Sequence, residues 1–199
     1  MKTIDFWFSI GSTYTYLSVS RISKIEDENQ VSFIWNPFSV RKLMMEMNNI
    51  PFTPPEKKVK SDYMWRDISR RAKNYKLSPK IPAPYPLKNF DLANQIAVHG
   101  INEGWCEEYV RLTYKYWFES GIEAGSEECI DKVSKDMNFN PNDLIKNSSS
   151  NTIIEKYDAQ TDKARELGIF GSPSFISNGE IFWGDDRLED AINLSLIHI

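Results

Sequence analysis

The pattern of strand, loop, helix and strand at the start of the chain places the strongest constraint on its fold. Apolar side chains recur at every second position of residues 4–8, which predicts a short β-strand. Gly11-Ser12-Thr13 then interrupts the alternation, a partial apolar stripe in residues 14–25 predicts a helix, and residues 31–35 predict a second strand. Two strands joined by so short a helical connection form a parallel pair with a right-handed crossover.

The end of the chain mixes helix and strand again. Residues 151–167 predict a helix, and two short apolar runs at 174–177 and 180–183 predict strands. Asn178-Gly179 separates these runs, and an Asn-Gly pair in that position is a strong hairpin signal. A final helix is expected from Asp186 onward.

The middle of the chain is predicted to be helical. One helix is expected over about 55–75, between proline-rich turns at 51–55 and 79–86. Further helices are expected at 90–103, 105–120, 126–137 and 142–147. The order is therefore β-α-β, a block of helices, and α-β-β-α, which is the order of a thioredoxin-like core with an inserted helical subdomain. We predict one α/β unit over 1–199, with its core at about 1–40 and 150–199 and the insertion at about 41–149.

Charge and hydropathy exclude several classes of function. The 24 basic and 28 acidic residues are scattered along the chain and give a net charge of −4, so neither nucleic acid nor anionic lipid is an expected partner. Asp5 lies where a signal peptide would be apolar, and no window approaches the roughly 18 apolar residues of a membrane span. We expect a cytoplasmic protein with a small-molecule substrate.

The two cysteines, Cys106 and Cys129, lie in sequence that predicts helix, without a CxxC spacing. Only His99 and His198 accompany them as possible metal ligands, so no metal is expected. Both cysteines are interpreted as reduced thiols that are buried or half-buried.

Ser12 lies where a strand meets the start of a helix. Backbone N–H groups and the positive end of the helix dipole favour an anion there. Ser12 or Thr13 can instead serve as a helix cap, and the local sequence alone favours that role.

Three segments resemble the 2-hydroxychromene-2-carboxylate isomerases and kappa-class glutathione transferases, and the likeness extends over nearly the whole chain. Residues 5–17 resemble the opening of these enzymes, and Ser12 falls on their catalytic serine. Residues 168–175 resemble the segment around their cis-proline, which implies that Pro173 is cis and that backbone at Ser172 pairs with glutathione. The resemblance implies a DsbA-like fold, a glutathione cofactor and a homodimer.

Further residues are assigned to glutathione or substrate by the same resemblance. Residues 182–188 resemble the family's run before its last helix, so Asp186 is expected to bind the glutamyl ammonium group, unless it caps that helix. Asp185 adds a second carboxylate beside it, which is also expected to bind glutathione by strengthening the attraction for the ammonium group. Asn49 and Lys60 match secondary positions for carboxylate or oxo groups, although Lys60 also fits an ordinary solvated helix face.

The chain departs from the family pattern at three positions. Thr13 stands where proline is common, Ser172 where valine is common, and Asp185 where a neutral polar residue is usual. Trp65, Tyr85 and Trp183 are weaker candidates for the wall of an aromatic pocket, because most such residues are core packing.

The resemblance implies a glutathione-dependent isomerase that acts by reversible thiolate addition to an unsaturated aromatic 2-oxo acid. A thiol bound near a helix N-terminus ionises more readily, and the Ser12 hydroxyl is expected to donate a hydrogen bond to its sulfur. Two alternatives stay open: a kappa-like glutathione transferase, and a noncatalytic binding protein of the same fold. A disulfide oxidoreductase is disfavoured, because position 12 is serine and no second thiol lies nearby.

Overall fold

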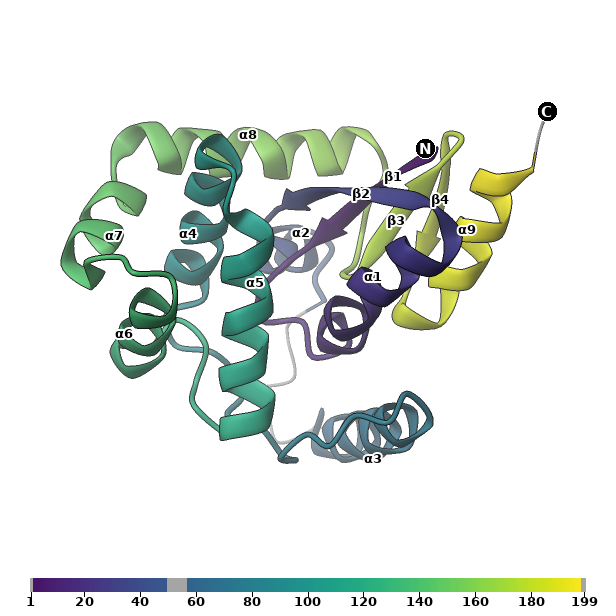
Figure 1. The fold of residues 1–199 in the computed structure, drawn as a ribbon, viewed down its shortest axis with the longest axis horizontal. Helices are drawn as coiled ribbons and strands as arrows, with labels where there is room; N and C mark the ends of the chain where they lie inside the picture. The colour runs from purple at the N-terminus through teal and green to yellow at the C-terminus, as the bar shows by residue number, and fades with distance from the viewer. Residues whose placement is uncertain (1, 50–56, 198–199) are drawn as a thin grey trace.

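The structure, a computed structural model, describes residues 2–49 and 57–197. Its centre is a four-stranded sheet with the order β2-β1-β3-β4 (Figure 1). The strands are β1 (Lys2–Phe8), β2 (Val31–Pro37), β3 (Ser174–Ser177) and β4 (Glu180–Trp183). β1 and β2 are parallel, whereas β3 is antiparallel to both β1 and β4. The parallel pair and the hairpin predicted from the sequence are both confirmed.

Helices cover both faces of the sheet. Helices α1 (Thr15–Asn29) and α9 (Leu188–Leu196) lie on one face, and α8 (Asn151–Glu166) crosses the other (Figure 1). This arrangement explains why Trp7 is as deeply buried as its apolar neighbours, although the alternating pattern would place it on the opposite face. Within the sheet, Phe6 pairs with Phe175 and their rings stack at 5.3 Å. The sheet thus has apolar cores on both sides.

The helical block follows the predicted order. It contains α4 (Phe90–Glu103), α5 (Cys106–Lys115), the π-helical turn η2 (Tyr116–Ser120), α6 (Glu127–Asp136) and α7 (Pro141–Ser148). Local sequence sets two of these starts: the Ser126 hydroxyl accepts from the Cys129 amide, and the Asn140 side chain accepts from two amides of α7. The sequence did not predict the change to π-helix at the end of α5.

Two short helices differ from the expected pattern. Helix α2 (Val40–Glu46) is capped by Ser39 and was not predicted. The last helix begins at Leu188 rather than Asp186, because a 3-10 turn, η3 (Asp185–Arg187), precedes it.

Helix α3 (Lys58–Asn74) corresponds to the helix expected over 55–75. The start of that prediction and the turn at 51–55 lie outside the described residues. In Figure 1, α3 lies at the border of the molecule, next to α1. Across residues 2–49 and 57–197, no helix combines the length and apolar character needed to cross a membrane.

Candidate active site

A cavity of about 420 Å³ opens beside the loop between β1 and α1. This volume lies within the range of roughly 300–1,000 Å³ that is usual for small-molecule sites. Its polar lining includes Ser12, Tyr14, Arg41, Asn49, Lys60 and Ser172. Its apolar lining includes Met44, Met64, Leu87, Phe90, Phe170 and Trp183. Residues from both ends of the chain and from the helical block therefore meet at one site.

Ser12 faces the segment before β3. Its hydroxyl donates a hydrogen bond of 2.6 Å to the backbone carbonyl of Ser172. The N-cap of α1 is Tyr14, and no side chain caps that helix end. The capping role that local sequence favoured for Ser12 or Thr13 is therefore wrong: the Thr13 hydroxyl instead lies 3.1 Å from the sulfur of Met64.

The Ser172–Pro173 peptide bond is cis, as the resemblance implied. The Ser172 hydroxyl accepts a hydrogen bond of 2.8 Å from the Ser9 amide and lies 2.9 Å from the Thr15 hydroxyl. Serine at this departure from the family pattern thus ties the cis-proline loop to the loop that carries Ser12. Two anchors hold these loops together, one through the Ser172 carbonyl and one through its side chain.

Two other predicted ligand-binding residues line the cavity from α3 and from the segment after α2. Asn49 follows α2 and has an exposed side chain, and its amide donates to Met44 O at 2.8 Å. Lys60 lies in the first turn of α3 and is also exposed. The structure therefore places Ser12, Ser172, Asn49 and Lys60 around one cavity, while their roles stay predictions.

Charge in the cavity favours an anion. Arg41 and Lys60 both line it, and none of its described lining residues is acidic. Sequence reasoning missed Arg41, because a basic pair at 41–42 looks like an ordinary solvated surface. Tyr14 donates to Asp67 at 3.0 Å, and burial together with this carboxylate raises the pKa of Tyr14, so the phenol stays neutral.

Aromatic side chains form the rim. Trp183 is 54% exposed and contacts Phe170 edge-on, with ring centroids 4.9 Å apart. Tyr85 also lines the cavity. Trp65 does not line it, but packs edge-on against Tyr85 at 6.0 Å.

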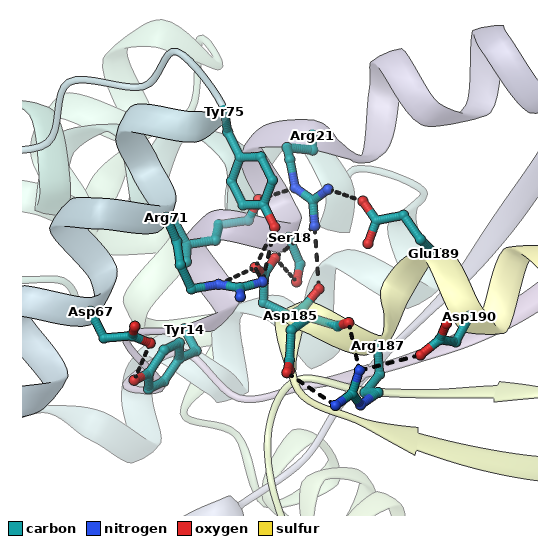
Figure 2. Close-up of polar contacts among 12 residues, drawn as sticks. Tyr14, Ser18, Arg21, Asp67, Arg71, Tyr75, Asp185, Arg187, Glu189 and Asp190 are labelled. Carbon is teal, nitrogen blue, oxygen red and sulfur yellow. Dashed lines mark hydrogen bonds and ion pairs between the residues drawn. The ribbon is translucent and has the colours of Figure 1, made fainter.

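Asp185 lies at the centre of a buried ion-pair network that joins three parts of the fold (Figure 2). Its side chain is fully buried. Oδ1 accepts from Ser18 at 3.1 Å and from Arg21 at 2.8 Å. Oδ2 accepts from Arg71 at 2.7 Å and from Tyr75 at 3.2 Å. The expectation that this carboxylate contacts a ligand ammonium is corrected: its oxygens are already occupied, and it lies outside the cavity lining.

Asp186 has a different environment from its neighbour. Its side chain is 49% exposed and lies 3.5 Å from the Arg187 guanidinium. Neither η3 nor α9 has a side-chain cap, so Asp186 is not a cap. Asp186 does not line the cavity, and its half-exposed side chain is accessible from solvent.

Cys106 and Cys129 are both free and buried, as predicted. Burial raises the pKa of both thiols, to about 12 for Cys129. Neither lines the cavity, so the site contains no thiolate of the protein's own. Within the described ranges, no cluster of His, Cys, Asp and Glu side chains has a metal-binding arrangement.

Comparison with known protein families identifies the family to which this fold belongs. A family described as the DsbA-like thioredoxin domain matches residues 3–193. The chain therefore belongs to the DsbA-like thioredoxin domain family.

Individual relatives within the comparison share one enzyme name. The 2-hydroxychromene-2-carboxylate isomerase of Pseudomonas putida is 27% identical over 185 residues, which cover 93% of this chain and 90% of the relative. The enzyme of that name from Sphingobium xenophagum is 23% identical over 94% of this chain and 95% of its own length. A solved structure of a 2-hydroxychromene-2-carboxylate isomerase superposes with a TM-score of 0.84 at 27% identity, covering 96% of this chain and 94% of that one.

A more distant solved structure shows the fold alone. The cytosolic disulfide reductase DsbM of Pseudomonas aeruginosa has a TM-score of 0.65 at 8% identity, covering 97% of this chain and 95% of that one. The isomerase relatives support the conclusion that this chain is an enzyme.

Proposed function

We propose that this protein is a glutathione-dependent isomerase of the 2-hydroxychromene-2-carboxylate isomerase type, acting on an unsaturated aromatic 2-oxo acid. The observation that carries the proposal is the contact between the Ser12 hydroxyl and the Ser172 carbonyl, in the lining of a mostly apolar cavity that also has two cationic side chains. The names of the isomerase relatives support the reaction class.

Glutathione fits the residues that surround this cavity. It has two carboxylates, and Lys60 attracts one of them in a lining without described acidic residues. It has one ammonium group, which the accessible carboxylate of Asp186 suits. Backbone of the cis-proline loop lies beside Ser12, where a peptide with its thiol at Ser12 would run. When bound, glutathione supplies a thiolate that adds reversibly to the conjugated double bond and so allows rotation about a single bond.

Ser12 has one hydroxyl proton, so it donates to one acceptor at a time. Without a ligand it donates to the Ser172 carbonyl. With a thiolate in the cavity, rotation of the hydroxyl would direct the same proton to sulfur. The Ser172 carbonyl would then be free to accept a hydrogen bond from a ligand donor. The hydrogen bond favours the ionised thiol, as does the nearby start of α1.

Calorimetric titration with glutathione tests this proposal. Wild type is expected to bind glutathione, and Ser12→Ala is expected to bind it more weakly. Ser23→Ala is the matched control, because Ser23 is exposed on the same helix. Absence of binding to wild type at millimolar glutathione contradicts the proposal and favours the noncatalytic binding protein. Equal glutathione affinity of Ser12→Ala and wild type shows that the Ser12 hydroxyl does not contribute to glutathione binding.

A kappa-like glutathione transferase is the second candidate, since the same thiolate can be consumed by an electrophile. Incubation with 2-hydroxychromene-2-carboxylate and a small excess of glutathione separates the two reactions. The isomerase leaves the amount of free glutathione unchanged while the substrate isomerises. A stoichiometric loss of free thiol identifies a transferase.

A further inference from the structure

We propose that Arg41 binds the carboxylate of the substrate and selects anionic over neutral substrates; this inference rests on the function proposed above. Arg41 lines the same cavity as Ser12 and Ser172. Neither the sequence pattern nor the resemblance assigned it a role.

The guanidinium of Arg41 is held in a fixed position but keeps donors available. One nitrogen donates to the Leu87 carbonyl at 3.2 Å, and the group lies over the Phe90 ring, 4.2 Å from its centroid. No carboxylate within the described residues forms an ion pair with it. A guanidinium has five N–H donors arranged as a fork that matches a carboxylate. A half-buried arginine with one carbonyl partner is therefore ready to accept an anion from the cavity.

The residues that surround the cavity assign Arg41 to the substrate rather than to glutathione. Ser172 and the rim residues Phe170 and Trp183 form the wall along which the peptide of glutathione is expected to lie. Phe90 packs directly against Gly11 of the Ser12 loop: a Cβ placed on Gly11 would lie 2.5 Å from its ring. Arg41 lies over this same ring. An electrophile that approaches the sulfur from the open side thus meets Phe90 with its apolar part and Arg41 with its charged end.

The experiment compares an acid with its neutral amide. The probes are trans-cinnamate and trans-cinnamamide, which share a flat unsaturated aromatic body and differ in charge. Their binding is measured by tryptophan fluorescence, with and without S-methylglutathione, which has no free thiol. The variants are Arg41→Met, which keeps an apolar stem over Phe90, and Arg41→Lys, which keeps the charge without the fork. Lys42→Met is the matched control, because Lys42 is exposed and pairs with Asp158 at 3.3 Å.

Wild type and Lys42→Met are expected to bind cinnamate about tenfold more tightly than cinnamamide, the effect of one charge-assisted contact. Arg41→Met is expected to lose this preference, Arg41→Lys to keep part of it, and glutathione affinity to change less than about twofold. The inference is overturned if wild type has no preference for the acid, or if Arg41→Met keeps it. It is also overturned if Arg41→Met loses glutathione affinity in parallel. Failure of wild type to bind glutathione refutes the proposed function, whereas the two probes still decide the role of Arg41.

Discussion

Replacing Asp185 with Asn is predicted to be the most destabilising conservative substitution near the site. The side chain is fully buried, and it satisfies Arg21 and Arg71, which are themselves only 12% and 24% exposed. Breaking a buried ion pair from one side costs about 3–5 kcal/mol, because the remaining charge stays buried without compensation. The lower value applies here, since Arg21 keeps its contact with Glu189 and both arginines retain some contact with water.

The predicted loss is therefore about 3 kcal/mol in the free energy of unfolding, or about 6–12 °C in Tm for a chain of this size. Urea and thermal unfolding followed by circular dichroism measure it. Asp190→Asn is the control, because Asp190 forms an exposed pair with Arg187 at 3.4 Å and is expected to cost less than about 1 kcal/mol. A loss for Asp185→Asn no greater than that of the control refutes the reasoning.

A double-mutant cycle adds a second test of the same network. Arg71→Met and Asp185→Asn are expected to combine with less than the sum of their effects, by about 1 kcal/mol or more, because they remove one interaction. Arg71 lies in α3, so hydrogen exchange in α3 is expected to accelerate in either variant. Additive effects mean that the two side chains act independently.

Three further outcomes are expected. Burial raises the pKa of both thiols, to about 12 for Cys129, while unfolded thiols ionise near about 8.5. The contribution of these thiols to the free energy of unfolding is therefore fully present below about pH 8.5 and is lost as the pH rises toward the pKa of the folded state. Urea unfolding of the Cys106→Ala/Cys129→Ala variant should show a smaller loss of stability at alkaline pH than wild type. An equal loss in the variant contradicts this prediction. Gly171→Ala places a Cβ 2.1 Å from Trp183 Nε1, so the indole must move and the tryptophan emission spectrum should change. The Tm should change little, because Trp183 is exposed. An unaltered emission spectrum refutes this prediction. Ser172→Ala removes the acceptor of a loop amide and should cost about 1–2 kcal/mol of unfolding free energy, whereas unchanged unfolding shows that the contact is dispensable.

The periodic and turn signals of the sequence were sufficient for most of the fold. Alternation at residues 4–8 and the Asn178-Gly179 turn indicate local structures that neighbouring residues determine, and both are present. The helices of the insertion were likewise predicted from local apolar spacing. The short helix α2 was missed, because seven residues supply too little periodicity to detect.

The site could be predicted only where residues match a familiar motif. Ser12 and Pro173 were found by resemblance, since no local rule places a cis-proline beside a distant serine. The burial of Asp185 was not predictable, because its partners Arg21 and Arg71 lie far away in sequence and only the fold brings them together. Arg41 was missed for the same reason: its aromatic partner Phe90 lies in another helix.

The central claim, that Ser12 stabilises a bound thiolate, is tested most directly by thiolate absorbance of bound glutathione as a function of pH. The account predicts that wild type and Ser23→Ala lower the pKa of the bound thiol below its ordinary value of about 8.5. In Ser12→Ala at saturating glutathione, the pKa should return toward that value. A bound thiol in wild type that ionises at the same pH as free glutathione contradicts the account, as does an equal lowering of its pKa in Ser12→Ala.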